Sequence, residues 1–146
     1  MKFGETINKF SEPPHPRGIS IEGKLVSLRP LVADKHSEEL FLSNALDKEN
    51  INWAYLPYGP FETEPEYHKW IKSFEKNIDP VFFAIISKKL NKAIGIASYL
   101  RINPADGLIE VGHINYSPLL QRTTEATETM FLMMKWAFDN GYRRYE

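Results

Sequence analysis

The segment Ile109–Asp139 reads IEVGHINYSPLLQRTTEATETMFLMMKWAFD and predicts a strand, a turn and a helix. Ile109 to Tyr116 is rich in β-branched and aromatic residues, and the strand is expected to stop at Ser117-Pro118 because proline cannot donate to a sheet ladder. Further on, apolar residues recur at spacings of three and four and predict one face of a helix that ends at Asn140-Gly141. These residues are Ala126, Met130, Met133, Met134, Ala137 and Phe138.

A turn of small and polar residues, Gln121 to Ala126, joins this strand to this helix. The first amides of a helix have no partner inside the helix and lie at the positive end of its dipole. Such a turn can hold an anion, and a pyrophosphate would fit there. The apolar face of the helix that follows must pack on a sheet.

The order of strand, Q-x-x-small-x-A turn and amphipathic helix resembles the acetyl-CoA-binding motif of the GNAT N-acetyltransferases, whose pattern is (Arg/Gln)-x-x-Gly-x-(Gly/Ala). Gln121 and Ala126 match its first and last positions. Thr124 stands where glycine is usual, and Glu125 adds a carboxylate near the expected phosphates. The cofactor-binding side chains that the resemblance implies are Gln121, Arg122, Thr123, Thr124, Glu125 and Ala126.

Three other stretches resemble parts of the same family. Gly23–Leu31 is similar to the first strand of its RimJ/RimL-type branch, and Phe82–Ile85 with Ile94–Tyr99 is similar to its central hairpin. Gly141–Glu146 resembles the start of the strand after the cofactor helix. The resemblance, which runs from about Gly23 to the last residue, implies an α/β (α+β) fold: a GNAT-like mixed, mostly antiparallel sheet flanked by helices.

We expect two parts in the chain: an extended, loosely ordered N-terminal arm over residues 1–20 and a single domain over residues 21–146. With 146 residues, 42% of them hydrophobic, the chain is long enough for one packed core. In the GNAT family another helix and further strands follow the strand after the cofactor helix. The resemblance therefore implies a domain truncated at its carboxyl end, with a general acid in the missing part. An unpaired final strand would favour a homodimer.

Composition excludes several classes of function. A net charge of -1 with scattered Lys and Arg gives no basic face for nucleic acid. The absence of cysteine excludes disulfides, and no apolar run suits a signal peptide or a bilayer span. The four histidines lie on separate elements without ligand spacing. We expect a cytoplasmic protein without a metal, nucleic-acid or membrane partner.

Hydrophobic periodicity places the remaining elements. Helices are expected over His36–Leu46, with His36 at the exposed start, and over Glu62–Asn77. Strands are expected over Leu25–Leu31, Val81–Ser87 and Ala93–Ile102. The last two should form an antiparallel meander with the strand that begins at Ile109.

The segment Trp53–Phe61 (WAYLPYGPF) combines four aromatic rings with two prolines and a glycine, so it is expected to be a stiff loop. One interpretation is that the rings cap the core between two helices. The other is that they form a wall of an acceptor pocket. In the GNAT fold this segment helps to form the acceptor site, which favours a substrate-binding role for Trp53, Tyr55 and Tyr58.

The resemblance implies transfer of an acetyl group from acetyl-CoA to a primary amine, on a protein amino terminus or a small molecule, by direct attack in a ternary complex. The attacking amine must lose a proton. Glu110, the only acid on its strand, is the first candidate for the base, and His113 competes for the role because an imidazole titrates near neutrality. The two would face opposite sides of a regular strand, so both can serve only if Gly112 marks a bulge.

By the same resemblance, the main chain of Ile114 and Tyr116 would pair with the pantetheine amides. Tyr99 and Arg101 on the preceding strand are expected to face the acceptor, with structural packing as the alternative for Tyr99. Two other functions stay open. In the first, the chain would be a catalytically weak or inactive remnant of the family that binds acyl-CoA or only self-associates. In the second, it would be an aromatic-lined binding module, and the turn at Gln121 would be an ordinary strand-to-helix connection.

Overall fold

The fold is built on one six-stranded sheet. A computed structural model describes residues 4–6 and 9–146 of the chain. In space the strands follow their sequence order from β1 to β6. The first five pair antiparallel and β6 lies parallel to β5, so the predicted mixed, mostly antiparallel sheet is confirmed. The strands are β1 (Ile21–Glu22), β2 (Val26–Pro30), β3 (Val81–Ser87), β4 (Lys92–Asn103), β5 (Leu108–Tyr116) and β6 (Arg144–Tyr145).

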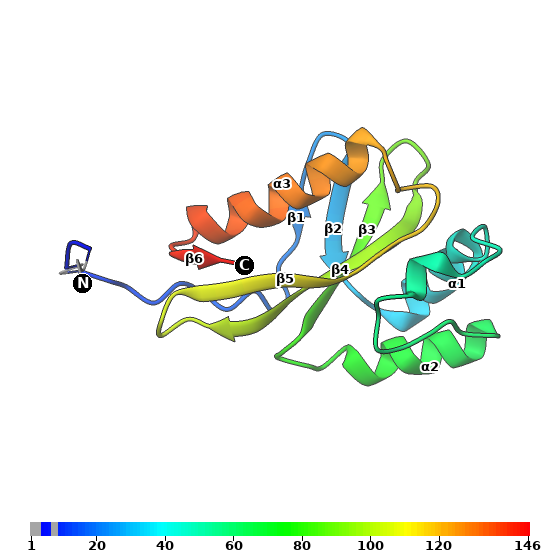
Figure 1. The fold of residues 1–146 in the computed structure, drawn as a ribbon, viewed down its shortest axis with the longest axis horizontal. Coiled ribbons are helices and arrows are strands. Elements are labelled where there is room, and N and C mark those ends of the chain that lie inside the picture. The colour runs from blue at the N-terminus through cyan, green and yellow to red at the C-terminus, as the bar shows by residue number, and fades with distance from the viewer. Residues whose placement is uncertain (1–3, 7–8) are drawn as a thin grey trace.

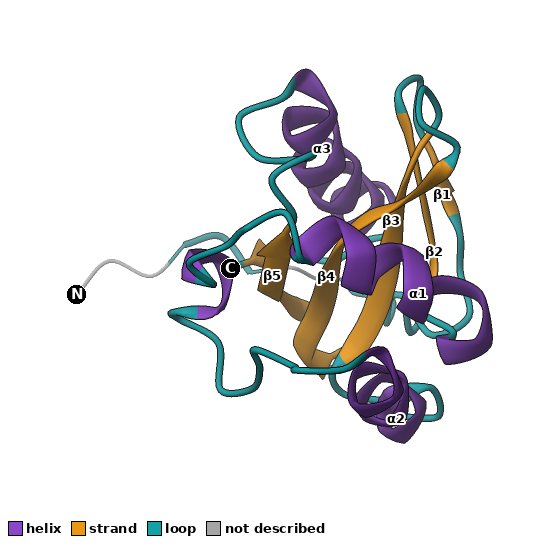
Figure 2. Cartoon of the chain, turned by 90° about the vertical axis from the view of Figure 1, so that its right-hand side faces the viewer, coloured by secondary structure: helices purple, strands orange, loops and turns teal. Residues whose placement is uncertain are grey.

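Helices cover both faces of this sheet (Figure 1). Helix α3 (Thr124–Asp139) lies on one face, and α1 (Ala33–Asn44) and α2 (Glu64–Phe74) lie together on the other (Figure 2). A short 3-10 helix, η1 (Ile51–Trp53), lies within the loop between α1 and α2. Each helix in the described ranges is too short or too polar to cross a membrane.

Two hydrophobic cores result, one on each face. Alternate residues of β3 supply both, because successive side chains of a strand point to opposite faces. Val81, Phe83 and Ile85 lie under α3. Phe82 and Ala84 lie under α1 and α2.

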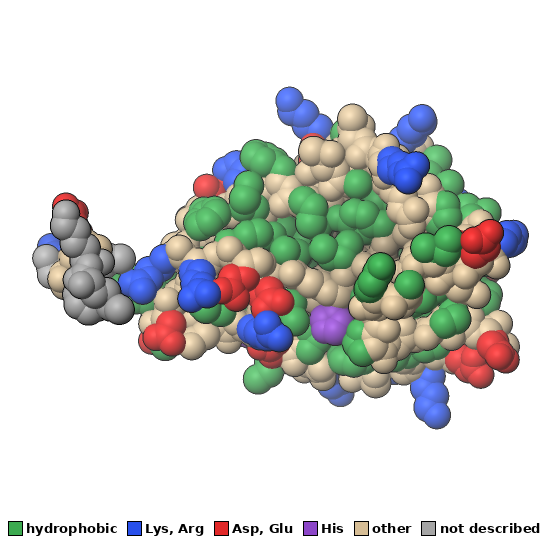
Figure 3. All heavy atoms as spheres, viewed as in Figure 1, with side chains coloured by type: hydrophobic (Ala, Val, Ile, Leu, Met, Phe, Trp, Pro, Cys, Tyr) green, Lys and Arg blue, Asp and Glu red, His purple; other side chains and the backbone are tan. Residues whose placement is uncertain are grey.

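Helix α3 begins and ends where the sequence predicts. The Thr123 side chain caps it by accepting the Ala126 N–H (3.2 Å), and the helix ends before Asn140 and Gly141. Its buried face differs from the prediction: Met134 and Phe138 are 41% and 50% exposed. Apolar residues occur on more than one side of α3, so their spacing does not identify the side that meets the sheet. The residues buried there are Thr129, Leu132, Met133 and Ala137, and apolar side chains also gather on the outer surface over α3 (Figure 3).

Two predictions about the amino-terminal half need correction. The described part of the arm has no helix or strand before Ile21, but it is not loose, because Pro13 is buried and the Tyr142 hydroxyl donates to the Pro14 carbonyl oxygen (3.1 Å). Residues 1–3 and 7–8 of the arm lie outside the described residues, and the division at residue 20 stays a prediction. His36 is buried rather than exposed, and its Nδ1 accepts the Val32 N–H (3.1 Å) at the start of α1.

Candidate active site

A bulge interrupts β5 at His113. Ile96 pairs with Asn115 and Ser98 pairs with Gly112, so two residues of β5 lie opposite one residue of β4. His113 itself has a left-handed backbone with φ of 50°. A bulge of this kind leaves one residue unpaired and re-aims its side chain. The bulge that the sequence required at Gly112 is therefore present, and His113 carries the unusual backbone.

The bulge brings His113 and Glu110 to the same face of the sheet. Ile109 is buried under α3, so Glu110 points to the α1 and α2 side. His113 would point away from that side in a regular strand. With the extra residue its ring lies there, stacked on Tyr58 (centroids 5.6 Å apart) and against Phe82 (5.3 Å).

The electrostatics of this pair favour a neutral imidazole. Partial burial lowers the pKa of His113, and the Glu110 carboxylate opposes that shift without cancelling it. His113 is therefore uncharged near pH 7 and has a nitrogen lone pair that can accept a proton.

Glu110 is already paired. Its carboxylate accepts a hydrogen bond from the Arg101 guanidinium (2.8 Å). Arg101 lies at a second register shift, in β4, where φ is 47° and the Asp79 carboxylate accepts the N–H groups of Arg101 (3.0 Å) and Ile102 (2.9 Å). The Arg101 side chain is 73% exposed, so the pair is weak and open to exchange.

The aromatic loop contributes one ring, that of Tyr58, next to His113. Trp53 is buried and meets Tyr58 edge to face (6.3 Å), and Tyr58 in turn packs on Trp70 (4.3 Å). A Cβ on Gly59, where φ is 70°, would lie 2.4 Å from the Trp53 ring, so glycine is required for the loop to fold over this ring. Both interpretations of the loop thus have a basis: Trp53 caps the core, and Tyr58 contacts the candidate base.

Two predicted acceptor residues lie elsewhere. Tyr99 is buried under α3, and its hydroxyl donates to the Met133 carbonyl oxygen (2.6 Å). Strand alternation places Tyr99 on the face opposite to Glu110. The structure therefore shows the alternative role for Tyr99, which is packing. Tyr55 is fully exposed. It lines a shallow cavity of about 460 Å³ together with Ile114, Gln121 and Arg122.

The turn before α3 has the geometry of an anion site. Arg122 has φ of 58°, and the N–H groups of Thr124 and Glu125 are among the four that no carbonyl of the helix can accept. Thr124 is exposed. Gln121 is held in place, since its Nε2 donates to the Tyr116 carbonyl oxygen (2.7 Å).

Glu125 does not point freely into this turn. Its carboxylate accepts the Ser87 hydroxyl (2.6 Å) at the end of β3. The space beside it, about 590 Å³, is also lined by Lys24, Lys88 and Lys89. These lysines were not among the predicted residues. Lys24 is far in sequence from Lys88 and Lys89, and the pairing of Val26 with Ser87 brings it beside them.

The edge of β5 is open beyond Val111. β6 pairs with Leu108 and Ile109, and the Val111 N–H donates to the Glu146 carbonyl oxygen (2.8 Å). Ser117 donates across to β4, so by the alternation of the ladder the N–H groups of Tyr116 and Ile114 point away from β4. In the described chain no strand covers this part of the edge.

The residues predicted for the cofactor thus adjoin this open edge, while Glu110, His113 and Tyr58 meet on the α1 and α2 side of the same strand. Among the described residues, no group of three or more His, Cys, Asp or Glu side chains could hold a metal ion.

The sequence matches no protein-family model and no curated protein. Among solved structures, a GCN5-related N-acetyltransferase from Brucella melitensis is 38% identical with a TM-score of 0.90, and the match covers 95% of this chain and 63% of that one. A probable acetyltransferase of the GNAT family from Chromobacterium violaceum is 36% identical with a TM-score of 0.88, with 99% and 72% covered. The RimL ribosomal L7/L12 alpha-N-protein acetyltransferase is 17% identical with a TM-score of 0.67, with 87% and 69% covered, a likeness of fold alone.

The chain therefore spans 63% of the length of the Brucella melitensis protein and 72% of that from Chromobacterium violaceum. The sequence identity to both proteins is above a third. It extends over nearly the whole of this chain and most of the Chromobacterium violaceum protein, so the likeness goes beyond a shared fold. The chain belongs to the GNAT family of acetyltransferases.

Proposed function

We propose that this protein is an acetyl-CoA-dependent N-acetyltransferase that acetylates a primary amine, on a protein amino terminus or a small molecule, by direct attack in a ternary complex. The observation that carries the proposal is the bulge at His113. It places a neutral imidazole and a carboxylate together on the strand whose open edge leads to the amino end of α3.

Acetyl-CoA would supply the acetyl group as an activated thioester. The residues that would hold it are the main chain of Ile114 and Tyr116 and the turn Gln121–Ala126. Three observations support the fit: strand amides that point away from β4, free amides at the start of α3, and lysines beside that helix end. Thr124 and Glu125 do not block the turn, since Thr124 is exposed and Glu125 is bonded to Ser87.

His113 would accept the proton that the attacking amine loses. Its lowered pKa keeps the acceptor nitrogen unprotonated at neutral pH. Glu110 would act as a second acceptor or would attract the cationic amine, in competition with Arg101. Tyr58, stacked on His113, would border the acceptor.

Binding without turnover is the second candidate function. The Arg101–Glu110 ion pair favours it, because this pair occupies the only carboxylate on the strand. Membership of the RimJ/RimL-like branch is a further proposal, supported by the sequence of Gly23–Leu31. The homodimer, the cytoplasmic location and the missing carboxyl-terminal part stay predictions.

Release of the thiol from acetyl-CoA in the presence of amino-terminal peptides and small amines tests the proposal. Turnover that disappears in His113→Gln while the variant still binds acetyl-CoA would support it. Binding without turnover for every amine would favour the second candidate. Equal turnover by His113→Gln and the parent chain would contradict the assigned base.

A matched pair of variants tests the location of the cofactor site. Thr124→Glu places a carboxylate at the exposed start of α3, where it favours the helix dipole but repels phosphate. Thr127→Glu makes the same change at an exposed position further along the helix. We expect the first variant to lose acetyl-CoA binding and the second to keep most of it. Equal binding by both would place the phosphates elsewhere.

A further inference from the structure

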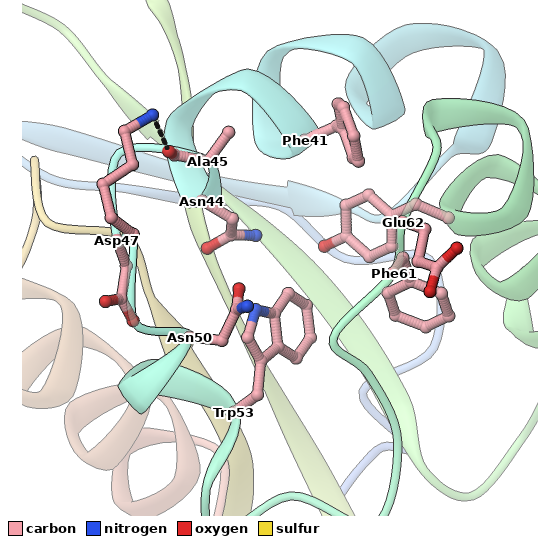
Figure 4. A pocket seen from close by; sticks show the side chains of 10 residues that line it. Phe41, Asn44, Ala45, Asp47, Asn50, Trp53, Phe61 and Glu62 are labelled. Atoms are coloured by element: carbon pink, nitrogen blue, oxygen red, sulfur yellow. Dashed lines mark hydrogen bonds between the residues drawn. The ribbon is translucent and has the colours of Figure 1, made fainter.

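A second cavity lies outside the candidate active site, between the end of α1, η1 and the segment before α2. Its volume is about 380 Å³, within the range of small-molecule sites. Figure 4 shows the Asn44 amide and the Trp53 indole pointing into the same space, with Phe41 and Phe61 at its other side. His113 does not line this cavity. The rings of Trp53 and Tyr58 lie between the two sites, since Tyr58 contacts both Trp53 and His113.

Two polar groups at the inner end of the cavity have no hydrogen-bond partner among the described residues. They are Asn44 Nδ2 and the Tyr67 hydroxyl, on side chains only 5% and 1% exposed. The two lie near each other, and the Asn44 amide offsets part of the rise that burial causes in the pKa of Tyr67, but they do not meet hydrogen-bond geometry. A buried polar group without a partner is costly, so a ligand that satisfies both groups would gain affinity.

The Asn44 amide is hydrogen-bonded on one side. Its Oδ1 accepts a hydrogen bond from Asn52 Nδ2 (2.9 Å). With the amide in this orientation, Nδ2 faces the unsatisfied side. The inner end of the cavity therefore offers a donor at Asn44 and a hydroxyl at Tyr67, and it calls for a ligand with a hydrogen-bond acceptor.

The rim of the cavity favours a cation, whereas the inner end favours a hydrogen-bond acceptor. Asp47, Lys48 and Glu62 line it, which gives two carboxylates against one ammonium. Lys48 Nζ donates to the Ala45 carbonyl oxygen at the end of α1 (2.9 Å), and Asp47 accepts the Asn52 N–H (2.8 Å). Glu62 is exposed and is the carboxylate left to attract a cation. The aromatic walls favour a flat apolar body and a positive charge near their rings.

We propose that this cavity binds a small arylalkylamine that carries a ring hydroxyl, as a second ligand site separate from the acetyl transfer site. The ring oxygen would accept from Asn44 at the inner end, the ring would lie among Trp53, Phe41 and Phe61, and the ammonium would meet Glu62. The rings of Trp53 and Tyr58 separate a ligand in this site from His113, so it would not be the reacting amine.

Titration of the ¹⁵N-labelled chain with tyramine, without acetyl-CoA, tests the proposal. For a ligand of this size we expect a dissociation constant of about 1 mM or tighter. The Asn44 side-chain amide and the Trp53 indole signals should shift, and the indole of Trp136, which belongs to α3, should not. Phenethylamine lacks the acceptor and 2-(4-hydroxyphenyl)ethanol lacks the ammonium, so each should bind about 5-fold more weakly.

Two matched pairs of variants locate the ligand. Ala45→Phe fills the cavity from an exposed position, and Ala54→Phe adds the same side chain outside it. Glu62→Gln removes the rim charge, and Glu49→Gln removes a charge outside the lining. We expect Ala45→Phe to abolish the shifts and Glu62→Gln to weaken them, with both controls unchanged.

Three outcomes would overturn the proposal: no shift with tyramine, shifts that persist in Ala45→Phe, or shifts centred on His113 and Ile114. The last would identify the amine as an acceptor at the active site. The acetyl-CoA-binding site is separate, so Ala45→Phe should still bind acetyl-CoA. Loss of this site and failure of the proposed acetyl transfer are therefore distinguishable.

Discussion

The two faces of the sheet are built differently. Under α3 the buried hydroxyl of Tyr99 has its acceptor at Met133, and the core around it is apolar. Under α1 and α2 the hydroxyls of Tyr58 and Tyr67 are buried without a partner. Among the described residues, Tyr116 has the only such atom outside the α1 and α2 side; the others belong to Asn44, Asn52, Tyr58, Tyr67 and Asn115.

This difference separates stability from function. A face with few unsatisfied polar groups and close packing gains more from burial. A face with unsatisfied donors and a bulged strand has groups that a ligand can complete. The bulge at His113 turns a side chain toward the second face, which is why the candidate base lies there.

The largest expected effect concerns catalysis on the α1 and α2 side. His113→Gln removes the proposed base and should lower kcat about 10²–10⁴-fold. Steady-state kinetics with the best amine acceptor measures this, and the unfolding free energy in urea checks that the variant is folded. A loss of kcat that comes only with a loss of stability would assign His113 to packing against Tyr58.

A core truncation tests the α3 side. Met133 is fully buried, and Met133→Ala should lower the unfolding free energy by about 2–5 kcal/mol. Phe131→Ala on the same helix is the control, because Phe131 is 52% exposed and should cost less than about 1 kcal/mol. Similar losses for both, measured by urea denaturation, would mean that something covers the outer side of α3 in solution.

A pair of hydroxyl deletions compares the two faces directly. Tyr99→Phe leaves the Met133 carbonyl without its side-chain donor and should cost about 1 kcal/mol. Tyr58→Phe removes a hydroxyl that has no partner, so the unfolding free energy should stay the same or rise slightly. Chemical denaturation of both variants gives the two values. An equal cost would show that the Tyr58 hydroxyl is satisfied in solution.

The smallest effect is a pH dependence of stability. Burial lowers the pKa values of His36 and His113 in the folded state. The unfolded chain then binds more protons, so stability is fully present above the unfolded pKa of about 6.5 and falls as the pH drops below it. Urea unfolding at pH 7.5 and 5.5 measures the loss. In His36→Gln the unfolding free energy should change less between these two pH values. An unchanged difference would show that His36 does not contribute to the pH dependence.

Much of the fold follows from the sequence, because it depends on local patterns. The strand up to Tyr116, the break at Ser117-Pro118 and the cap and end of α3 are all set by neighbouring residues. The face that α3 buries was only partly predicted. Met134 and Phe138 fit the helical spacing as well as Leu132 does, and contacts with the sheet decide between them.

The site was harder to predict because it depends on register. The need for a bulge near Gly112 came from the sequence, but the side to which His113 turns depends on how β5 pairs with β4. Tyr99 was given two possible roles, facing the acceptor or packing, and the structure shows packing, because Tyr99 pairs with Val111 and shares the face under α3. Lys24 and Lys88 meet the α3 amino end only through strand pairing.

The central claim is that the open edge of β5 and the amino end of α3 bind acetyl-CoA. The melting temperature of this chain with and without acetyl-CoA, with free CoA for comparison, tests it most directly. At about a hundred times the dissociation constant, binding to the folded state alone should add about 2.7 kcal/mol of stability, a clear upward shift. We expect this shift for the parent chain and for Thr127→Glu, and its loss in Thr124→Glu. A chain that melts cooperatively and shows no shift with acetyl-CoA would contradict the account.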